Sequence, residues 1–173
     1  VEGESHFLEQ QICDGLVDVG LFPTPIYSQD LESYPVLDEQ ILLAISVENK
    51  KAIAIADSLM TGDGIREIAP FGAFPFILLR EGLKLRTLVN RLCQAECFVP
   101  KAVIGSETLD SCRSLVADDY GITFLPSTLN RKGDDDKVKF YPLASKLCFR
   151  QLVLVARSDR AKRFHLSEVA HIM

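Results

Sequence analysis

The cysteines of this chain offer the most varied chemistry, because a thiolate binds metals, forms disulfides and reacts with oxidants. There are five of them, an odd number, and no Cys-x-x-Cys pair occurs. Cys93 and Cys97 are four residues apart, which places both on one face of a helix. A zinc site needs further ligands, but the histidines stand only near the chain ends, at positions 6, 165 and 171. We therefore expect reduced, mostly buried thiols, no metal site and no cofactor.

A second group of polar residues stands where strands give way to helices. Arg80 and Glu81 follow the apolar run Pro75–Leu79, and Thr108 precedes an amphipathic run that begins at Leu109. The N–H groups at a helix start attract anions, and a guanidinium beside them is suited to bind a carboxylate or a phosphate. These residues predict a site for a small polar or anionic molecule. The alternatives are simple helix capping by Thr108 and a surface ion pair between Arg80 and Glu81.

Other kinds of chemistry lack their motifs. The chain has no nucleophile elbow, no glycine-rich phosphate loop and no histidine near these segments, so we do not expect an enzyme. The formal net charge of −5 excludes the chain itself as a DNA-binding surface, because phosphates are neutralised by clustered Lys and Arg. We interpret the charged run 131–137 as a solvated loop. A calcium loop is the alternative, although the EF-hand spacing and its closing Glu are absent.

Helices and strands alternate along most of the chain. Helices are predicted over 5–16, near 83–96, from 109 onward, and at the end, where Phe164, Leu166, Val169 and Ile172 share a face. Strands are predicted over 16–22, 34–47, 75–79, 101–104 and 150–156, and in the segment that ends at Pro126. Residues 48–74 carry only a weak pattern. The runs 34–47 and 150–156 are long enough to link two lobes, so the sequence predicts a two-lobed α/β fold with parallel sheets.

Five segments keep a fixed order and spacing. The longest is SETLDSCRSLVADDYGITFLP (106–126), and the others are GLVDVGLF (15–22), PVLDEQILLAIS (35–46), PFILLREG (75–82) and FRQLVLVARSDR (149–160). Taken together, they resemble the effector-binding domain of LysR-type transcriptional regulators. Asp119 stands where that family usually has the first of two glycines, and Asp is one of the few residues that tolerate a left-handed backbone.

The resemblance implies a fold similar to type 2 periplasmic binding proteins, with two Rossmann-like lobes joined by two crossing strands. Lobe I would comprise residues 1–47 and 157–173, and lobe II residues 48–156. The resemblance also implies that the chain is a fragment. It would lack the amino-terminal winged helix-turn-helix, the linker helix and the first strand of lobe I.

The resemblance further implies that a small effector binds between the lobes, at strand ends and helix starts. Carried over position by position, the effector-binding residues would be Glu4, Ser5, Phe22, Pro23, Thr24, Arg80, Glu81 and Thr108. Ser5 has the alternative of a simple cap, and Phe22 that of a core residue. Pro23 stands where relatives that bind aromatic or tricarboxylic acids often have an arginine, which weakens the case for a strongly anionic effector.

Peroxide-sensing relatives carry two cysteines in the helix after the cleft loop. Cys93 aligns with the second, but Lys84 stands at the position of the reactive first one, so we do not expect peroxide sensing. Lys84 and Arg86 either add positive charge near the site or merely solvate their helix.

We therefore expect the regulatory domain of a cytoplasmic transcriptional regulator, with no membrane contact. DNA would be bound only through the missing amino-terminal domain. A solute-binding protein of a transporter is the alternative, and it would be recognised by an export signal. The resemblance also implies a homodimer or homotetramer, with the helix 5–16 of one copy against the helix 83–96 of another. The apolar face of the second helix comprises Leu85, Leu88, Val89 and Leu92.

Overall fold

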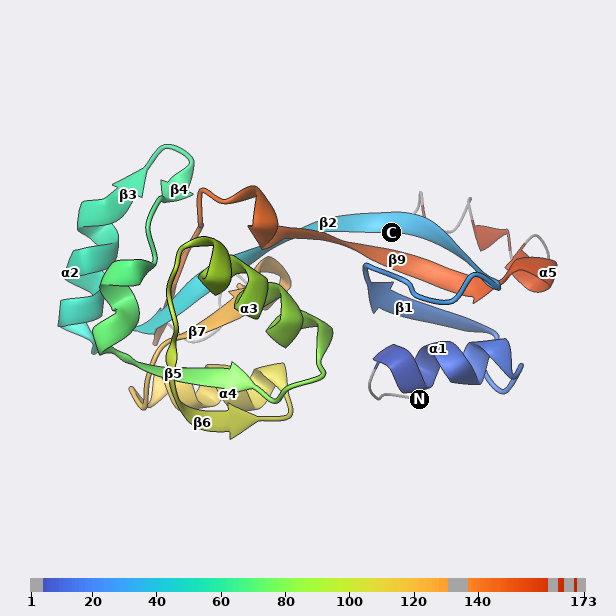
Figure 1. The fold of residues 1–173 in the computed structure, drawn as a ribbon, viewed down its shortest axis with the longest axis horizontal. Helices are drawn as coiled ribbons and strands as arrows, with labels where there is room; N and C mark the ends of the chain where they lie inside the picture. The colour runs from blue at the N-terminus through green and yellow to red at the C-terminus, as the bar shows by residue number, and fades with distance from the viewer. Residues whose placement is uncertain (1–4, 131–136, 162–164, 167–169, 171–173) are drawn as a thin grey trace. The chain divides into compact units, whose positions relative to one another are not determined.

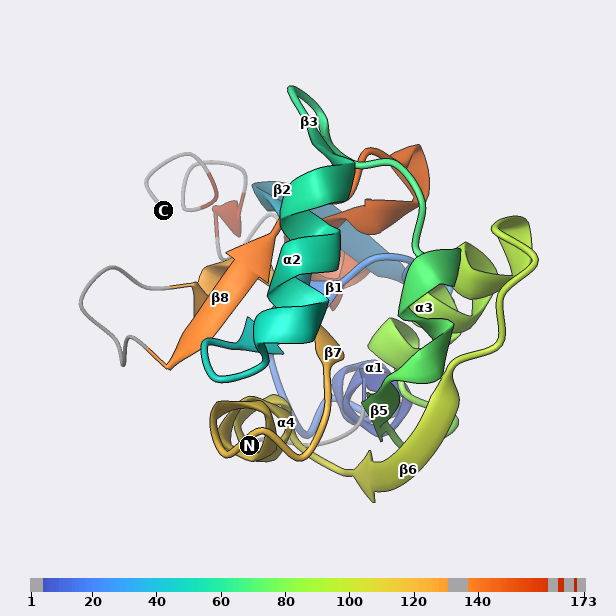
Figure 2. The same cartoon turned by 90° about the vertical axis from the view of Figure 1, so that its left-hand side faces the viewer.

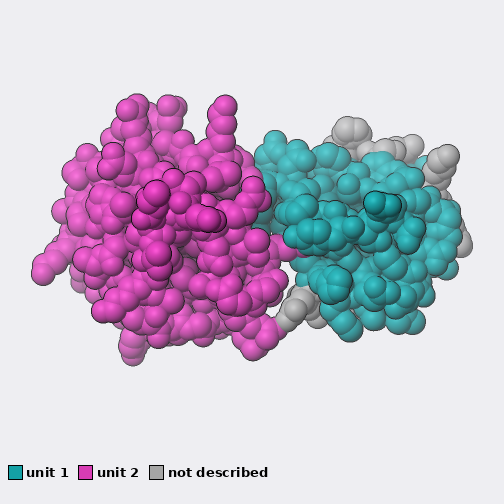
Figure 3. Space-filling view, in the orientation of Figure 1, with its two compact units in different colours: residues 1–39, 150–173 teal, residues 40–149 magenta. Residues whose placement is uncertain are grey.

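The computed structural model describes residues 5–130, 137–161, 165–166 and 170, and the chain divides into two compact units (Figure 3). Unit 1 comprises residues 1–39 and 150–173, and unit 2 comprises residues 40–149. The two connections lie in β2 (Leu31–Ser46) and at the start of β9 (Phe149–Arg157). Two long strands thus link the units, as the runs 34–47 and 150–156 predict. The connections precede the predicted lobe boundaries at 47/48 and 156/157.

Unit 1 is built on a sheet with the strand order β1–β9–β2, in which β1 and β9 run antiparallel. The prediction of parallel sheets is therefore wrong for this unit, because β1 pairs with a strand that returns from unit 2. Its other elements are α1 (Ser5–Cys13), β1 (Val19–Pro23) and α5 (Ser158–Ala161). The helix α1 lies along β1 (Figure 1) and packs Ile12 against Phe22, Val153 and Val155. It ends before the predicted end at residue 16, because Gly15 takes a left-handed conformation with φ +74°. Of the predicted final helix face, Leu166 is buried, and positions 164, 169 and 172 lie outside the described residues.

Unit 2 holds the larger core, around a sheet that combines parallel and antiparallel pairs. Its remaining elements are α2 (Lys50–Leu59), β3 (Met60–Thr61), β4 (Gly64–Ile65), η1 (Ala69–Ala73), β5 (Pro75–Leu79), α3 (Lys84–Ala95), β6 (Lys101–Ser106), α4 (Leu109–Ala117), β7 (Thr123–Pro126), η2 (Ser127–Leu129), β8 (Val138–Tyr141) and η3 (Lys146–Cys148). β5 and β6 are parallel, and a bridge from Phe76 to Ile122 continues the sheet toward β7. β2 then pairs antiparallel with both β7 and β8. The charged run 131–136 lies outside the described residues.

The connection 48–74, which the sequence left without a helix, contains α2. The side chain of Asn49 caps this helix by accepting a hydrogen bond from the Ala52 N–H at 3.1 Å. The sequence of this helix shows no strong apolar periodicity, because the residues that it buries completely are the small Ala52 and Ala56. It lies next to β8 (Figure 2), where the Asp57 carboxylate accepts a hydrogen bond from the Tyr141 hydroxyl at 2.8 Å. The weak pattern of residues 48–74 therefore conceals a helix that the sequence analysis did not predict.

Asp119 adopts the left-handed conformation that its place in the 106–126 segment requires, with φ +57°. The N–H groups of Asp119 and Tyr120 donate to carbonyls in the last turn of α4, as at many helix ends. The carboxylate of Asp119 also accepts a hydrogen bond from the Asn49 side-chain amide at 3.0 Å. The aspartate thus connects the end of α4 to the cap of α2, which a glycine cannot do.

Among the described residues, no helix is long and apolar enough to cross a membrane.

Candidate functional site

The carboxyl ends of β5 and β6 lie side by side in unit 2, and each strand is followed by the start of a helix. Leu79 and Ser106 are register partners at the ends of these parallel strands. The Arg80 N–H donates to the Ser106 carbonyl at 2.8 Å, so the pairing continues into the loop before α3. Ligands of open α/β sheets bind outside the carboxyl ends of strands. This strand-end site brings together three residues that the sequence singles out, Arg80, Glu81 and Thr108.

Thr108 caps α4, as the sequence predicts. Its hydroxyl accepts a hydrogen bond from the Ser111 N–H at 3.1 Å and lies 2.8 Å from the Ser111 hydroxyl. The Thr108 N–H in turn donates to the buried Ser106 hydroxyl at 3.3 Å. The Thr108 side chain is already hydrogen-bonded within α4. The groups at this helix start that can bind a ligand are therefore the N–H groups of its first turn.

The charged residues pair differently from the surface ion pair considered above. The Arg80 guanidinium lies 3.7 Å from the Glu107 carboxylate, and both side chains are well exposed. Glu81 instead pairs with Arg86 at 2.7 Å. The alternative of an Arg80–Glu81 ion pair is therefore corrected to two separate pairs, of which Arg80–Glu107 is the longer.

Arg86 fixes the loop between β5 and α3, a role that the sequence did not reveal. Its side chain is only 16% exposed, and it donates to the Leu79 carbonyl at 3.3 Å and to the Asn90 side-chain oxygen at 2.9 Å. Within this loop Gly82 adopts φ +91°, a conformation that favours glycine. Arg86 thereby holds Glu81 beside its own helix and leaves Arg80 as a cation of the strand-end site. Neither reading given to Arg86 above, added charge or mere solvation, describes this role.

The predicted site residues of unit 1 stand in the sequence around the start of α1 and the end of β1. Glu4 lies outside the described residues, and Ser5 is the first residue of α1. Phe22 is buried in the core of unit 1, as in its alternative reading, and Pro23 pairs with Leu152. The Thr24 N–H donates to the Gln151 carbonyl at 2.8 Å, so this backbone donor is bound within unit 1.

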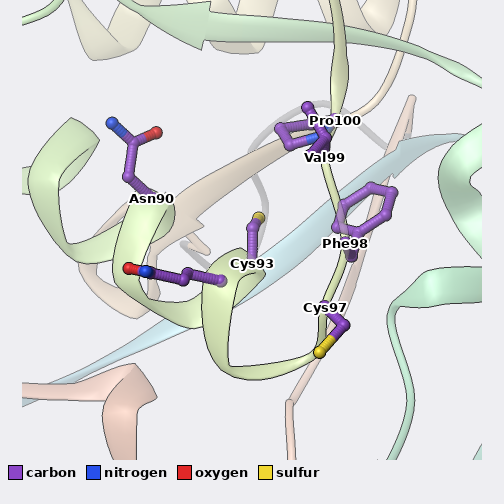
Figure 4. Close-up of a pocket in the computed structure, with 7 residues that line it drawn as sticks. Asn90, Cys93, Cys97, Phe98, Val99 and Pro100 are labelled. Carbon is purple, nitrogen blue, oxygen red and sulfur yellow. The ribbon is translucent and has the colours of Figure 1, made fainter.

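The thiols follow the expected pattern, with Cys93, Cys112 and Cys148 buried and Cys97 exposed. Burial raises the pKa of Cys93 to about 11 and that of Cys148 to about 12. Cys93 and Cys97 do not share a helical face, because α3 ends at Ala95 and Cys97 takes φ +50°. They line a hollow of about 420 Å³ (Figure 4), where their sulfur atoms point in different directions. The described residues contain no metal-binding group of His, Cys, Asp and Glu.

We expect iodoacetamide at pH 8 to alkylate Cys97 before Cys93 and Cys148, at least about tenfold faster. The reason is that alkylation needs an accessible thiolate, and burial suppresses both access and ionisation of the other two thiols. Peptide mass spectrometry over time measures the rates, and Cys97→Ser is the control that removes the fast product. Equal rates at Cys93 and Cys97 in the folded protein would contradict the burial of Cys93.

The family model of the LysR substrate binding domain matches residues 1–171. The chain belongs to this family. It is 30% identical over 169 residues to the HTH-type transcriptional regulator YcgK of Bacillus subtilis, covering 92% of this chain and 52% of that protein. It is 25% identical to a hydrogen peroxide-inducible genes activator of Haemophilus influenzae, covering 98% of this chain and 54% of that protein. The LysR domain thus spans about half the length of these relatives.

Solved structures of LysR regulatory domains have the same fold. The reduced form of OxyR gives a TM-score of 0.76 at 24% identity, covering 99% of this chain and 76% of that one. The CcmR regulatory domain of Synechocystis PCC6803 in complex with 2-PG gives 0.76 at 15% identity, covering 98% of this chain and 81% of that one. The predicted fold, two α/β lobes joined by crossing strands as in periplasmic binding proteins, is therefore confirmed.

Proposed function

We propose that this LysR domain senses a small metabolite and modulates transcription through a DNA-binding domain elsewhere in the full-length regulator. The observation that carries the proposal is the strand-end site of a chain that matches the LysR substrate binding domain over residues 1–171. Relatives that are transcriptional regulators favour this function over the solute-binding alternative. Regulation of transcription also places the protein in the cytoplasm and implies no catalysis.

The chemistry of the strand-end site supports a small polar or anionic effector. Arg80 supplies a guanidinium, and α3 begins without a side-chain cap, so its first N–H groups are not bound by a capping side chain. An anion is favoured at such a place by both the helix start and the cation. The Glu107 carboxylate lies 3.7 Å from the Arg80 guanidinium, and an anionic effector would compete with it there. The resemblance to the family implies that residues of both lobes bind one effector, and this stays a prediction. The roles of Ser5 and Thr24 as effector contacts also stay predictions.

Peroxide sensing is not part of the proposal, although one relative is named for a response to hydrogen peroxide. A peroxide-reactive thiol has a lowered pKa and access to solvent. Cys93 is buried, and its pKa is raised. Lys84 occupies the position at which the resemblance implies the reactive cysteine.

A ligand screen tests the proposed function directly. The chain is heated with single members of a panel of carboxylic acids, amino acids, phosphorylated acids and sugars, with 2-PG among them. A true effector raises the melting temperature further with each increase in its concentration above the Kd, because it binds only the folded state. Calorimetric titration of each hit then gives the stoichiometry, which is expected to be one per chain. A panel without any saturable binder would count against effector sensing.

We also propose self-association through α1, with a correction to the surface expected on its partner. Leu85, Val89 and Leu92 of α3 are buried in the core of unit 2, so most of the apolar face assigned to pairing is already used. Exposed apolar side chains that follow α3 in the chain include Val99, which is 87% exposed, and Val103 on β6. On α1, Phe7 is 55% exposed. Exposed apolar groups of this kind mark interaction surfaces when they cluster.

We expect Phe7→Asp to weaken the homodimer about tenfold, because a buried aromatic anchor of an interface is replaced by a charge that must be desolvated. Sedimentation velocity at tens of micromolar measures the distribution of dimer and monomer. Tyr120→Ser, which removes an exposed aromatic residue of unit 2, is the matched control and should leave the dimer unchanged. A wild-type chain that sediments as a monomer at these concentrations would contradict this pairing.

A further inference from the structure

A buried ion pair connects the two strands that link the units. The Arg150 guanidinium Nε lies 2.6 Å from the Glu39 carboxylate Oε2, and the two side chains are only 9% and 2% exposed. Glu39 is the last residue of unit 1 on β2, and Arg150 is the first residue of unit 1 on β9. β2 and β9 are neighbours in the sheet. The pair therefore lies at the point where both strands leave unit 1.

The residues next to Glu39 and Arg150 in the sequence make further hydrogen bonds, both within unit 1 and within unit 2. The Gln151 side-chain amide donates to the Asp38 carboxylate at 2.9 Å, which adds a second bond between the same strands. On the other side of the pair, Gln40 is held within unit 2, since its N–H donates to the Ser127 hydroxyl at 3.3 Å and its side chain to the Leu143 carbonyl at 3.2 Å. Residues 39 and 40, although adjacent, are thus bonded within different units.

Gln151 also binds Thr24, one of the residues proposed to contact the effector. The Thr24 N–H donates to the Gln151 carbonyl at 2.8 Å, and the Gln151 N–H donates to the Thr24 hydroxyl at 3.2 Å. These bonds continue the β1–β9 pairing beyond Pro23, which faces Leu152. The position of Thr24 is therefore determined by Gln151 of β9, which is next to Arg150 of the ion pair.

Stability alone is a weak explanation for such a pair. The desolvation of two buried charges often exceeds their attraction, and replacement of a buried pair by apolar residues is frequently neutral or stabilising. In several proteins, a buried polar or ionic group instead fixes the geometry between the segments that carry it. In this protein, the pair joins the two linking strands β2 and β9. Gln151, next to Arg150, adds a hydrogen bond to Thr24 after β1.

We propose that Glu39 and Arg150 form a positioning pair, which fixes Thr24 relative to both linking strands so that a molecule bound at Thr24 acts on them. The role of Thr24 in this proposal rests on the proposed function. The positioning itself does not, because it is a property of the protein without an effector.

Amide hydrogen exchange in the ligand-free chain tests the proposal. The double variant Glu39→Leu/Arg150→Met removes both charges and keeps apolar bulk, so we expect it to fold with a melting temperature near that of the wild type. Exchange at the Thr24 and Gln151 amides should become about tenfold faster, as expected when a buried network loses a coupling of ordinary strength. Exchange at Leu21 and Val153, farther along the same strands, and at Leu43 in unit 2 should not change.

Asp57→Leu/Lys139→Met is the matched control, because it removes an exposed ion pair of 3.0 Å that lies wholly within unit 2. It should leave the Thr24 and Gln151 amides at their wild-type rates. Unchanged rates at these amides in the folded Glu39/Arg150 double variant would overturn the proposal. So would an equal acceleration over all of β1 and β9, since that indicates a merely structural role.

If the double variant does not fold, Arg150→Lys decides the question. Lysine keeps the charge but not the planar donor group that approaches Glu39. Faster exchange confined to Thr24 and Gln151 supports positioning, and wild-type rates overturn it. Because no effector is added, a failed ligand screen leaves this result intact, so the failure of the proposed function and the failure of this inference are distinguishable.

Discussion

Arg80→Ala should weaken effector binding about ten- to a hundredfold, because a hydrogen bond to a charged group contributes roughly 1.5 to 3 kcal/mol. Arg80 follows the end of β5 and precedes α3, and its guanidinium lies 3.7 Å from the exposed Glu107 carboxylate. An exposed ion pair at this distance contributes little, so a carboxylate or phosphate can compete with Glu107 for the guanidinium. Calorimetric titration of the best hit from the ligand screen measures the change.

Two further variants make this test specific. Glu107→Gln removes the competing carboxylate, and it should strengthen the binding of an anionic effector by up to about fivefold, the range of an exposed ion pair. Arg66→Ala removes an exposed arginine elsewhere in unit 2 and should leave the affinity unchanged. Equal affinities of Arg80→Ala and wild type would remove Arg80 from the site. Weaker binding by Glu107→Gln would show that the effector carries a positive group, against the anionic assignment.

Gly121→Ala should destabilise the fold by about 1 to 3 kcal/mol, the usual effect of forcing an extra methyl group into a packed place. A Cβ atom at Gly121 would lie 2.6 Å from the Pro75 carbonyl oxygen, which is part of the backbone and has no rotamer to change. That oxygen accepts the Ile122 N–H at 2.9 Å, and the Ile122 carbonyl accepts the Ile77 N–H at 2.9 Å. The substitution therefore strains the bridge that connects β5 toward β7.

Thermal unfolding measures this effect, with about 2 to 4 °C expected for each kcal/mol in a chain of this size. Gly105→Ala is the matched control, because nothing lies within 4 Å of a Cβ atom at that position in β6. The control should unfold within a degree or so of the wild type, as exposed substitutions usually do. If both variants unfold at the same temperature, the close approach of Gly121 to β5 is not a determinant of stability.

The sequence predicted features that depend on neighbouring residues along the chain. Thr108 is a cap because its hydroxyl needs only the N–H of Ser111, which the start of any helix places within reach. Asp119 was expected in a left-handed conformation for a similarly local reason, and its φ of +57° confirms this. The two linking strands were visible as apolar runs, and the order of the motifs indicated the LysR family. By contrast, α2 was missed because its buried residues are alanines.

For the candidate site, the sequence determined which residues follow the strands, and the tertiary structure decided what each one does. Arg80 and Glu81 are adjacent in sequence, but Glu81 pairs with Arg86, while Arg80 pairs with Glu107, which follows the neighbouring strand β6. Glu39 and Arg150 carry no pattern at all, since more than a hundred residues separate them. Caps and periodic faces follow from contacts within a few residues, which a sequence displays. Ion pairs and close backbone approaches such as that of Gly121 to Pro75 exist only once the sheet brings distant segments together.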